Sequence, residues 1–257
     1  MASIWKAWCK AGETMDNVFV SYITDNSVLL TLRSEQKNSL TQEIIVELAT
    51  AFDKYDSDPK VDIICFTGSE RAFCTGMNLE AMAKLEQESA IRTLYLLDIL
   101  LYKVLRSSKL IISAINGHAV GSGAVLALAT DYRLIDANEK IKIGFPEYPK
   151  GISLPGLMRE IIAKAGLHSA RMLLMGEFIN PMQAAAMELV DELCEVNLLT
   201  RLQELCAKLN SGNHNYRLYK QHFKGHGGYN MPQADDPEYA MVVSMVQNSV
   251  GRGVLDA

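Results

Sequence analysis

Three short segments of the 257-residue sequence combine glycines, polar residues and one carboxylate: RAFCTGMNL (71–79), NGHAVGSG (116–123) and GFPE (144–147). Each of the first two follows an apolar run typical of a buried strand and leads into a helical pattern. The first N–H groups of a helix lack an internal partner and lie at the positive end of its dipole. Two such helix starts after neighbouring parallel strands, with Met77 at or near one of them, can direct two N–H groups at one point. That is the design of an oxyanion hole.

Glycine-rich turns between strands and helices also occur simply to make the turn, so either segment alone is equally consistent with structure and with a site. Two phosphate-binding motifs are excluded. No Gly-Lys-Ser/Thr ends the glycine run, as a P-loop requires, and Gly121-Ser122-Gly123 lacks the third glycine of a dinucleotide-binding fingerprint.

Glu147 is the one carboxylate in these segments whose surroundings suggest chemistry. Taken alone, a loop glutamate is most simply a solvated charge. Phe145, Pro146 and Tyr148 surround it in the sequence, and an apolar setting would raise its pKa and make it a better general base near neutral pH. His118 is interpreted as a turn or core histidine, and no carboxylate pattern near the remaining histidines indicates a metal site.

Strand-like and helical patterns alternate along the chain, which predicts an α/β fold with a largely parallel sheet. The expected strands are 18–24, 27–32, 61–67, 110–115, 132–137, 141–144 and 191–196. Expected helices follow a capping box at 39–42 and cover 79–106 in two pieces, 124–130, 158–165, 169–175, 182–189 and 198–209. Residues 68–76 are expected to be a loop, and apolar residues at helical spacing from Tyr239 to Val246 predict a terminal helix that packs on another part of the chain.

Composition excludes several classes of protein. With 49% hydrophobic and 21% charged residues, the chain is ordinary for one large globular domain, and a net charge of −5 argues against a nucleic-acid binder. The five cysteines contain no CxxC pair, so neither a disulfide framework nor a zinc site is expected. Residues 110–130 carry no Asp, Glu, Lys or Arg, but the Asn-Gly turn inside them indicates a strand, a turn and a helix rather than a membrane span. With no secretory signal recognised, we expect a cytoplasmic protein.

Taken together, the motifs resemble the crotonase (enoyl-CoA hydratase/isomerase) superfamily over roughly Asn17 to Leu209. They are SEQKNSL (34–40), 71–79, 116–123, DYR (131–133) and GFPE. The resemblance implies a crotonase-like spiral of ββα units at 16–200 and a helical trimerisation region at 201–257. It further implies an acyl-CoA thioester substrate, no cofactor beyond the coenzyme A of that substrate, and a homotrimer or a dimer of trimers.

The resemblance also assigns roles to residues. The amides of Met77 and Ser122 would hold the thioester oxygen, and Glu147 would be catalytic. The loop around Ala72 and Phe73 would meet the adenine end of coenzyme A, with its phosphates near Arg71 or lysines. The full set of substrate-binding candidates is Lys37, Arg71, Ala72, Phe73, Gly76, Asn78, Leu79 and Gly121.

The sequence departs from the hydratase pattern where the first of two catalytic glutamates is expected, because that position is Val125. Asn78 replaces the usual Asp and Ser122 a glycine, and both keep a backbone amide. One carboxylate suffices to move a double bond but orients water poorly, so the leading hypothesis is a Δ3,Δ2-enoyl-CoA isomerase. The alternatives are another crotonase activity (hydratase, decarboxylase or thioester hydrolase) and a non-catalytic acyl-CoA-binding paralogue.

Overall fold

Two sheets organise the chain in a computed structural model that describes residues 15–35, 37–209, 216, 220 and 229–251. The larger sheet has the strand order β1-β2-β3-β5-β7-β10 and the smaller β4-β6-β8-β9. The strands of the larger sheet are Val18–Thr24, Ser27–Leu32, Ile63–Gly68, Leu110–Ile115, Tyr132–Asp136 and Glu192–Cys194, in that order. Those of the smaller sheet are Ala72–Cys74, His118–Val120, Ile143–Gly144 and Phe178–Ile179. Only the β1–β2 and β8–β9 pairs are antiparallel among the described strands, so the largely parallel arrangement is confirmed.

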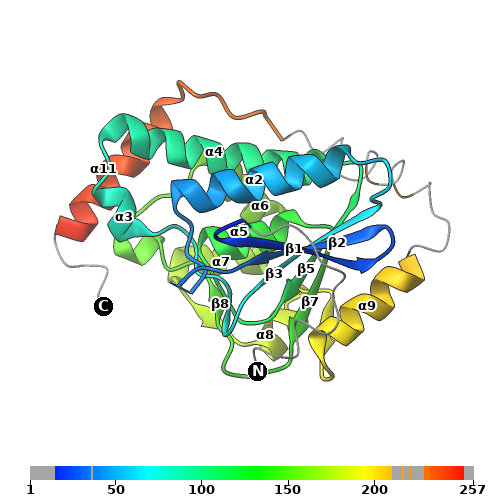
Figure 1. Cartoon of the computed structure of the whole chain (residues 1–257). Helices are drawn as coiled ribbons and strands as arrows, with labels where there is room; N and C mark the ends of the chain where they lie inside the picture. Colours follow the sequence, from blue (N-terminus) through cyan, green and yellow to red (C-terminus); the bar gives the residue numbers. More distant parts are fainter. Residues whose placement is uncertain (1–14, 36, 210–215, 217–219, 221–228, 252–257) are drawn as a thin grey trace.

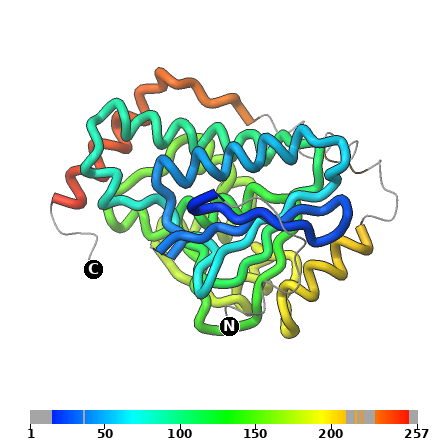
Figure 2. The backbone as a smooth tube through the Cα atoms, viewed as in Figure 1, coloured from blue at the N-terminus to red at the C-terminus, as the bar shows by residue number. Residues whose placement is uncertain are grey.

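Helices cover the sheets on two sides (Figure 1). They are α2 (Gln42–Ser57), α3 (Leu79–Ala83), α4 (Gln87–Arg106), α5 (Ser122–Ala129), α6 (Gly156–Lys164), α7 (Leu167–Met175), α8 (Pro181–Ala186), α9 (Leu198–Leu209) and α11 (Pro237–Gly251). Leu202 and Cys206 of α9 pack on β3, β5 and β7, whereas α2 and α4 run side by side above the sheet. Figure 2 shows α11, in red, beside α3 and α4, which confirms the expected terminal packing helix.

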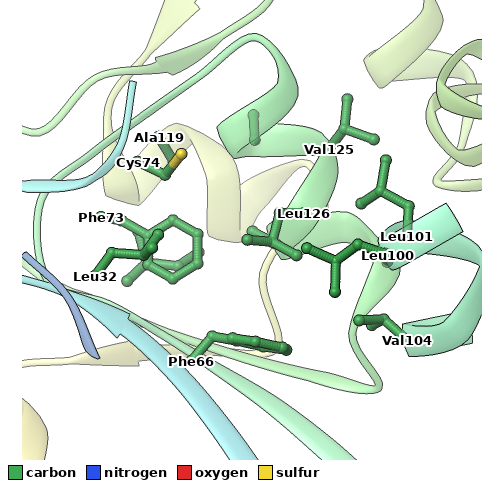
Figure 3. Packing of buried hydrophobic residues seen from close by; sticks show 14 of the residues in the cluster. Leu32, Phe66, Phe73, Cys74, Leu100, Leu101, Val104, Ala119, Val125 and Leu126 are labelled. Carbon is green, nitrogen blue, oxygen red and sulfur yellow. The ribbon is translucent and has the colours of Figure 1, made fainter. Parts of the chain in front are cut away.

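The main apolar core lies between the larger sheet and the helices around α5 (Figure 3). Phe52 of α2 stacks on Phe66 of β3 with ring centroids 6.0 Å apart, and both are fully buried. Each such side chain contributes about 1.5–3 kcal/mol by leaving water. Phe73 and Val125 lie in the same cluster, so the turns that carry the candidate site rest directly on packed core.

Two sequence expectations that bear on the candidate site were wrong in detail. Helix α2 is capped by Thr41, whose Oγ1 accepts a hydrogen bond from the Ile44 N–H (3.4 Å), and not by Ser39. The reason is that Leu40 forms a β-bridge with Met77, which keeps the chain extended until residue 41. Residues 68–76 are not all loop either, because β4 forms within them by pairing with β6. Strands of two or three residues have too little pattern to be recognised from sequence.

The DYR motif is part of the scaffold in this structure. The Asp131 carboxylate accepts a hydrogen bond from the Ile111 N–H (2.8 Å) and pairs with the buried ammonium of Lys220 (2.7 Å). Arg133 pairs with Asp191 at 2.8 Å. These contacts tie β5 and β7 to later parts of the chain. None of the described helices is both long and apolar enough to cross a membrane.

Candidate functional site

The first two glycine turns touch each other. Gly76 has φ +83°, and a Cβ atom there would lie 2.7 Å from the Val120 carbonyl oxygen and 3.3 Å from the Ser122 nitrogen. Real Cβ atoms do not approach backbone so closely, and L-residues rarely adopt this φ. Glycine at 76 therefore allows the turn that carries Met77 to rest on the turn that carries Ser122.

The N–H of Met77 takes no part in the β-bridge with Leu40 that fixes the position of Met77. The Leu40 N–H donates to the Gly76 carbonyl (2.7 Å), and the Asn78 N–H donates to the Leu40 carbonyl (2.9 Å). In a parallel bridge the residue between these two bonds directs its own N–H to the opposite side. Asn78 then caps α3 by accepting from the Ala81 N–H (2.9 Å). Replacement of the usual Asp by Asn keeps the cap, and with it the turn.

Ser122, the second donor that the sequence predicts, is the first residue of α5. Its N–H has no partner within the helix, since no turn precedes it. Gly121 before it has φ +55° and ψ −128°, a conformation that favours glycine. The Ser122 hydroxyl is buried and has no hydrogen-bond partner within the described residues. The N–H and the buried hydroxyl of Ser122 therefore lie at the positive end of an otherwise apolar helix.

Glu147 comes to the same point from the third segment. A Cβ atom at Gly121 would lie 2.1 Å from Glu147 Oε1, so the carboxylate lies against bare backbone next to Ser122. The carbonyl oxygen of Glu147 accepts hydrogen bonds from the N–H groups of Lys150 (3.1 Å) and Ile152 (3.0 Å). These bonds hold the 3₁₀ turn η1 (Tyr148–Lys150) that comes directly after it.

The Glu147 carboxylate is desolvated. Its Oε2 is enclosed and lacks a hydrogen-bond partner in the described part of the chain. Burial raises its pKa to about 7, against smaller lowering effects of its own N–H and the charge of Lys150. A carboxyl group with this pKa exchanges a proton readily near neutral pH.

Val125 occupies the position of the first of the two catalytic glutamates in the hydratase pattern. Its side chain is fully buried and lies in the core near Leu101 and Leu126 (Figure 3). The contacts at Gly76 and Gly121 therefore bring the turns of Met77 and Ser122 and the Glu147 carboxylate together.

The remaining predicted residues lie in β4, in the loops that flank it and at the start of α3. Lys37 and Arg71 are exposed, and their carbonyl oxygens accept hydrogen bonds from Thr75 Oγ1 (3.1 Å) and from the His118 N–H (3.0 Å). Leu79, the first residue of α3, is partly buried.

Two predicted contacts from β4 are restricted by burial. Phe73 is fully enclosed in the core and Ala72 is 2% exposed. Their side chains face packed protein, so only their backbone is in a position to meet a ligand.

His118 has a structural role, although it lies partly buried in β6 and not in a turn or the core. Its Nδ1 accepts a hydrogen bond from the Lys142 N–H (3.0 Å), which fixes the start of β8 beside β6. Sequence reasoning did not single out Lys150 or Ser249, although both lie close to the Glu147 turn. The Glu147-x-x-Lys150 spacing is a signal in the sequence from which Lys150 could have been found. The contact of Ser249 comes from a distant helix and leaves no such signal.

Known proteins resemble this chain in sequence and in fold. A family model described as "Enoyl-CoA hydratase/isomerase" matches residues 24–255. An (E)-benzylidenesuccinyl-CoA hydratase from Thauera aromatica is 33% identical over 196 residues, covering 74% of this chain and 72% of that protein. Alignments with relatives from Thermus thermophilus and Dictyostelium discoideum span 64% and 66% of those proteins, so this chain covers slightly less than two thirds of each.

Solved structures agree with the fold. An enoyl-CoA hydratase from Bacillus halodurans superposes with a TM-score of 0.82 at 22% identity, covering 94% of this chain and 100% of that one. The human mitochondrial delta3-delta2-enoyl-CoA isomerase gives 0.75 at 21% identity, covering 92% of each chain. At these identities the likeness extends to the fold alone, and both a hydratase and an isomerase share it.

Proposed function

This chain belongs to the enoyl-CoA hydratase/isomerase family, and from that premise we propose that it moves a double bond of an enoyl-CoA thioester from C3 to C2. Glu147 is the single acid and base in this proposal. The N–H groups of Met77 and Ser122 form the oxyanion hole. The coenzyme A belongs to the substrate, and a homotrimer or dimer of trimers stays a prediction that light scattering would test.

The proposed reaction needs one proton shuttle. The ionised Glu147 carboxylate removes a proton from C2 of the 3-enoyl thioester, and the electron pair of that C–H bond delocalises toward the thioester oxygen. The two backbone N–H groups stabilise the resulting dienolate, each contributing on the order of a hundredfold in rate. Protonated Glu147 then delivers the proton to C4, the double bond forms between C2 and C3, and the carboxylate is regenerated.

The observation that carries the proposal is the single carboxylate at the converging turns. Glu147 lies against Gly121, while the position that would hold a second carboxylate is the buried Val125. Hydration needs one group to activate water and another to deliver a proton, and an apolar side chain does neither.

Hydration of a 2-enoyl-CoA is the second candidate, and the names of relatives favour it. The Thauera aromatica relative is a hydratase by name, as is a 31% identical 2,3-dehydroadipyl-CoA hydratase from Escherichia coli. In that case the second acid would have to come from outside the three turns.

Incubation with 3-enoyl-CoA and with 2-enoyl-CoA separates these candidates. The isomerase proposal expects conjugated 2-enoyl-CoA from the first substrate, measured by its ultraviolet absorbance, and no 3-hydroxyacyl-CoA from the second, measured by mass spectrometry. Hydroxyacyl product without conjugation would replace isomerisation by hydration. Binding of both substrates with no product would favour the non-catalytic alternative.

The rate should depend on pH in the direction set by Glu147. Only the ionised carboxylate can remove a proton, and burial raises its pKa to about 7. We expect kcat/KM to fall about tenfold for each pH unit below that value and to level off above it, since kcat/KM reports the free enzyme. Initial rates across the range from acid to mildly alkaline pH test this. A flat profile through neutrality would contradict the assignment of Glu147 as base.

A further inference from the structure

Helix α11, from the far end of the chain, contacts segments that follow Met77 and Glu147 in the sequence. Gln247 Nε2 donates to the Leu85 carbonyl (3.3 Å), just beyond α3 and hence on the side of Met77. Ser249 Oγ donates to the Lys150 carbonyl (3.2 Å) in the turn directly after Glu147. Two residues of one helix therefore contact the segment beyond α3, the helix that follows Met77, and the turn directly after the proposed base.

The position of α11 is fixed by contacts of its first turn that do not involve Gln247 or Ser249. Glu238 accepts a hydrogen bond from the Gly156 N–H (2.8 Å), at the start of α6. Tyr239 Oη donates to the buried Asp98 carboxylate of α4 (2.9 Å). Further apolar contacts with α3 and α4 come from Val242, Val243 and Val246. These anchors define where Ser249 lies, and Figure 2 shows α11 against both helices.

The turn that Ser249 contacts is short and lies partly at the surface. Lys150 N–H donates to the Glu147 carbonyl, and Gly151 N–H donates to the Tyr148 carbonyl (2.9 Å). Such 3₁₀ bonds have poorer geometry than those of an α-helix, so a turn of this length gains from an outside contact. Tyr148 is 61% exposed, whereas Ser249 is 7% exposed and makes its contact away from bulk water.

We propose that Ser249 is a positioning residue, whose hydroxyl, presented by α11, holds the 147–151 turn so that the Glu147 carboxylate stays against Gly121. This role rests on the proposed function. It acts on the proton-transfer step and not on binding of coenzyme A, because Ser249 contacts the turn that follows Glu147 and none of the predicted coenzyme A contacts lies in that turn.

The test compares Ser249→Ala with two matched variants. Ser249→Thr keeps a hydroxyl. Ser244→Ala removes a hydroxyl from an exposed position of the same helix, where Ser244 Oγ accepts from Asn248 at 3.5 Å. With 3-enoyl-CoA we expect kcat to fall about three- to tenfold in Ser249→Ala, the equivalent of one ordinary hydrogen bond, with KM unchanged. Ser249→Thr should recover most of this loss, and Ser244→Ala should match the parent protein.

Hydrogen–deuterium exchange separates failure of this proposal from failure of the proposed function. Exchange of the Lys150, Gly151 and Ile152 amides should rise in Ser249→Ala and not in Ser244→Ala. An unchanged kcat in Ser249→Ala, or a loss expressed in KM, would overturn the positioning role. If the parent protein turns over neither enoyl-CoA, the proposed function fails, and exchange alone then decides. Unchanged exchange of the turn amides in Ser249→Ala would overturn the positioning role of Ser249, and faster exchange would support it.

Discussion

Glu147→Gln should lower the isomerisation rate by about a thousandfold or more, while acyl-CoA binding is retained. The amide keeps the shape of the side chain that lies against Gly121, but it cannot accept a proton from carbon. General base catalysis by a positioned carboxylate is worth roughly a hundred- to ten-thousandfold, and the site offers one such group. Steady-state rates with 3-enoyl-CoA and calorimetry with a non-reactive acyl-CoA measure the two effects separately.

The matched control is Glu195→Gln, which removes the same charge from an exposed position. It should leave both rate and affinity unchanged. If Glu147→Gln retained turnover within about tenfold of the parent protein, another group would have to be the base.

Gly121→Ala should reduce turnover by about a hundredfold or more through displacement of the base. The new methyl group would lie 2.1 Å from Glu147 Oε1, and the alanine backbone would have to adopt φ +55°. The carboxylate must therefore move away from Ser122, or the first turn of α5 must shift and carry the Ser122 N–H with it. Either movement separates groups that we propose act on one substrate, and loss of one oxyanion donor alone costs on the order of a hundredfold.

Gly166→Ala distinguishes this displacement from backbone strain. Gly166 also has positive φ, +115°, but a Cβ atom there would have no neighbour within 4 Å. It should lower the melting temperature, because the conformation disfavours alanine, without lowering kcat. Comparable losses of kcat in the two variants would show that strain, and not the position of the carboxylate, explains Gly121→Ala.

Elements with a clear local pattern were predicted well from the sequence. Strand β2 and helix α9 begin and end where periodicity places them, at Ser27–Leu32 and Leu198–Leu209, because each has a distinct apolar pattern along its whole length. The meeting of the Gly76 and Ser122 turns was also expected, since carboxyl ends of neighbouring parallel strands meet at one edge. The place of Glu147 beside them was implied by the resemblance to the crotonase superfamily.

Features that depend on contacts between distant segments could not be predicted. Strand β4 forms only because β6 lies beside it, and the cap of α2 moves to Thr41 only because Leu40 pairs with Met77. Burial of Phe73 likewise results from the way β4 lies on the core. The hydroxyl contact of Ser249 joins residues 99 positions apart, and no spacing rule in one sequence connects them.

The enclosed Glu147 carboxylate makes folding a proton-uptake reaction. Burial raises its pKa from 4.5 to about 7, so between these values the native chain holds a proton that the unfolded chain has released. This group favours the native state fully below pH 4.5 and less as pH rises through 7. The difference is on the order of 3 kcal/mol. The ionised form of Glu147, which can abstract a proton, is therefore also the form in which this group stabilises the native state least.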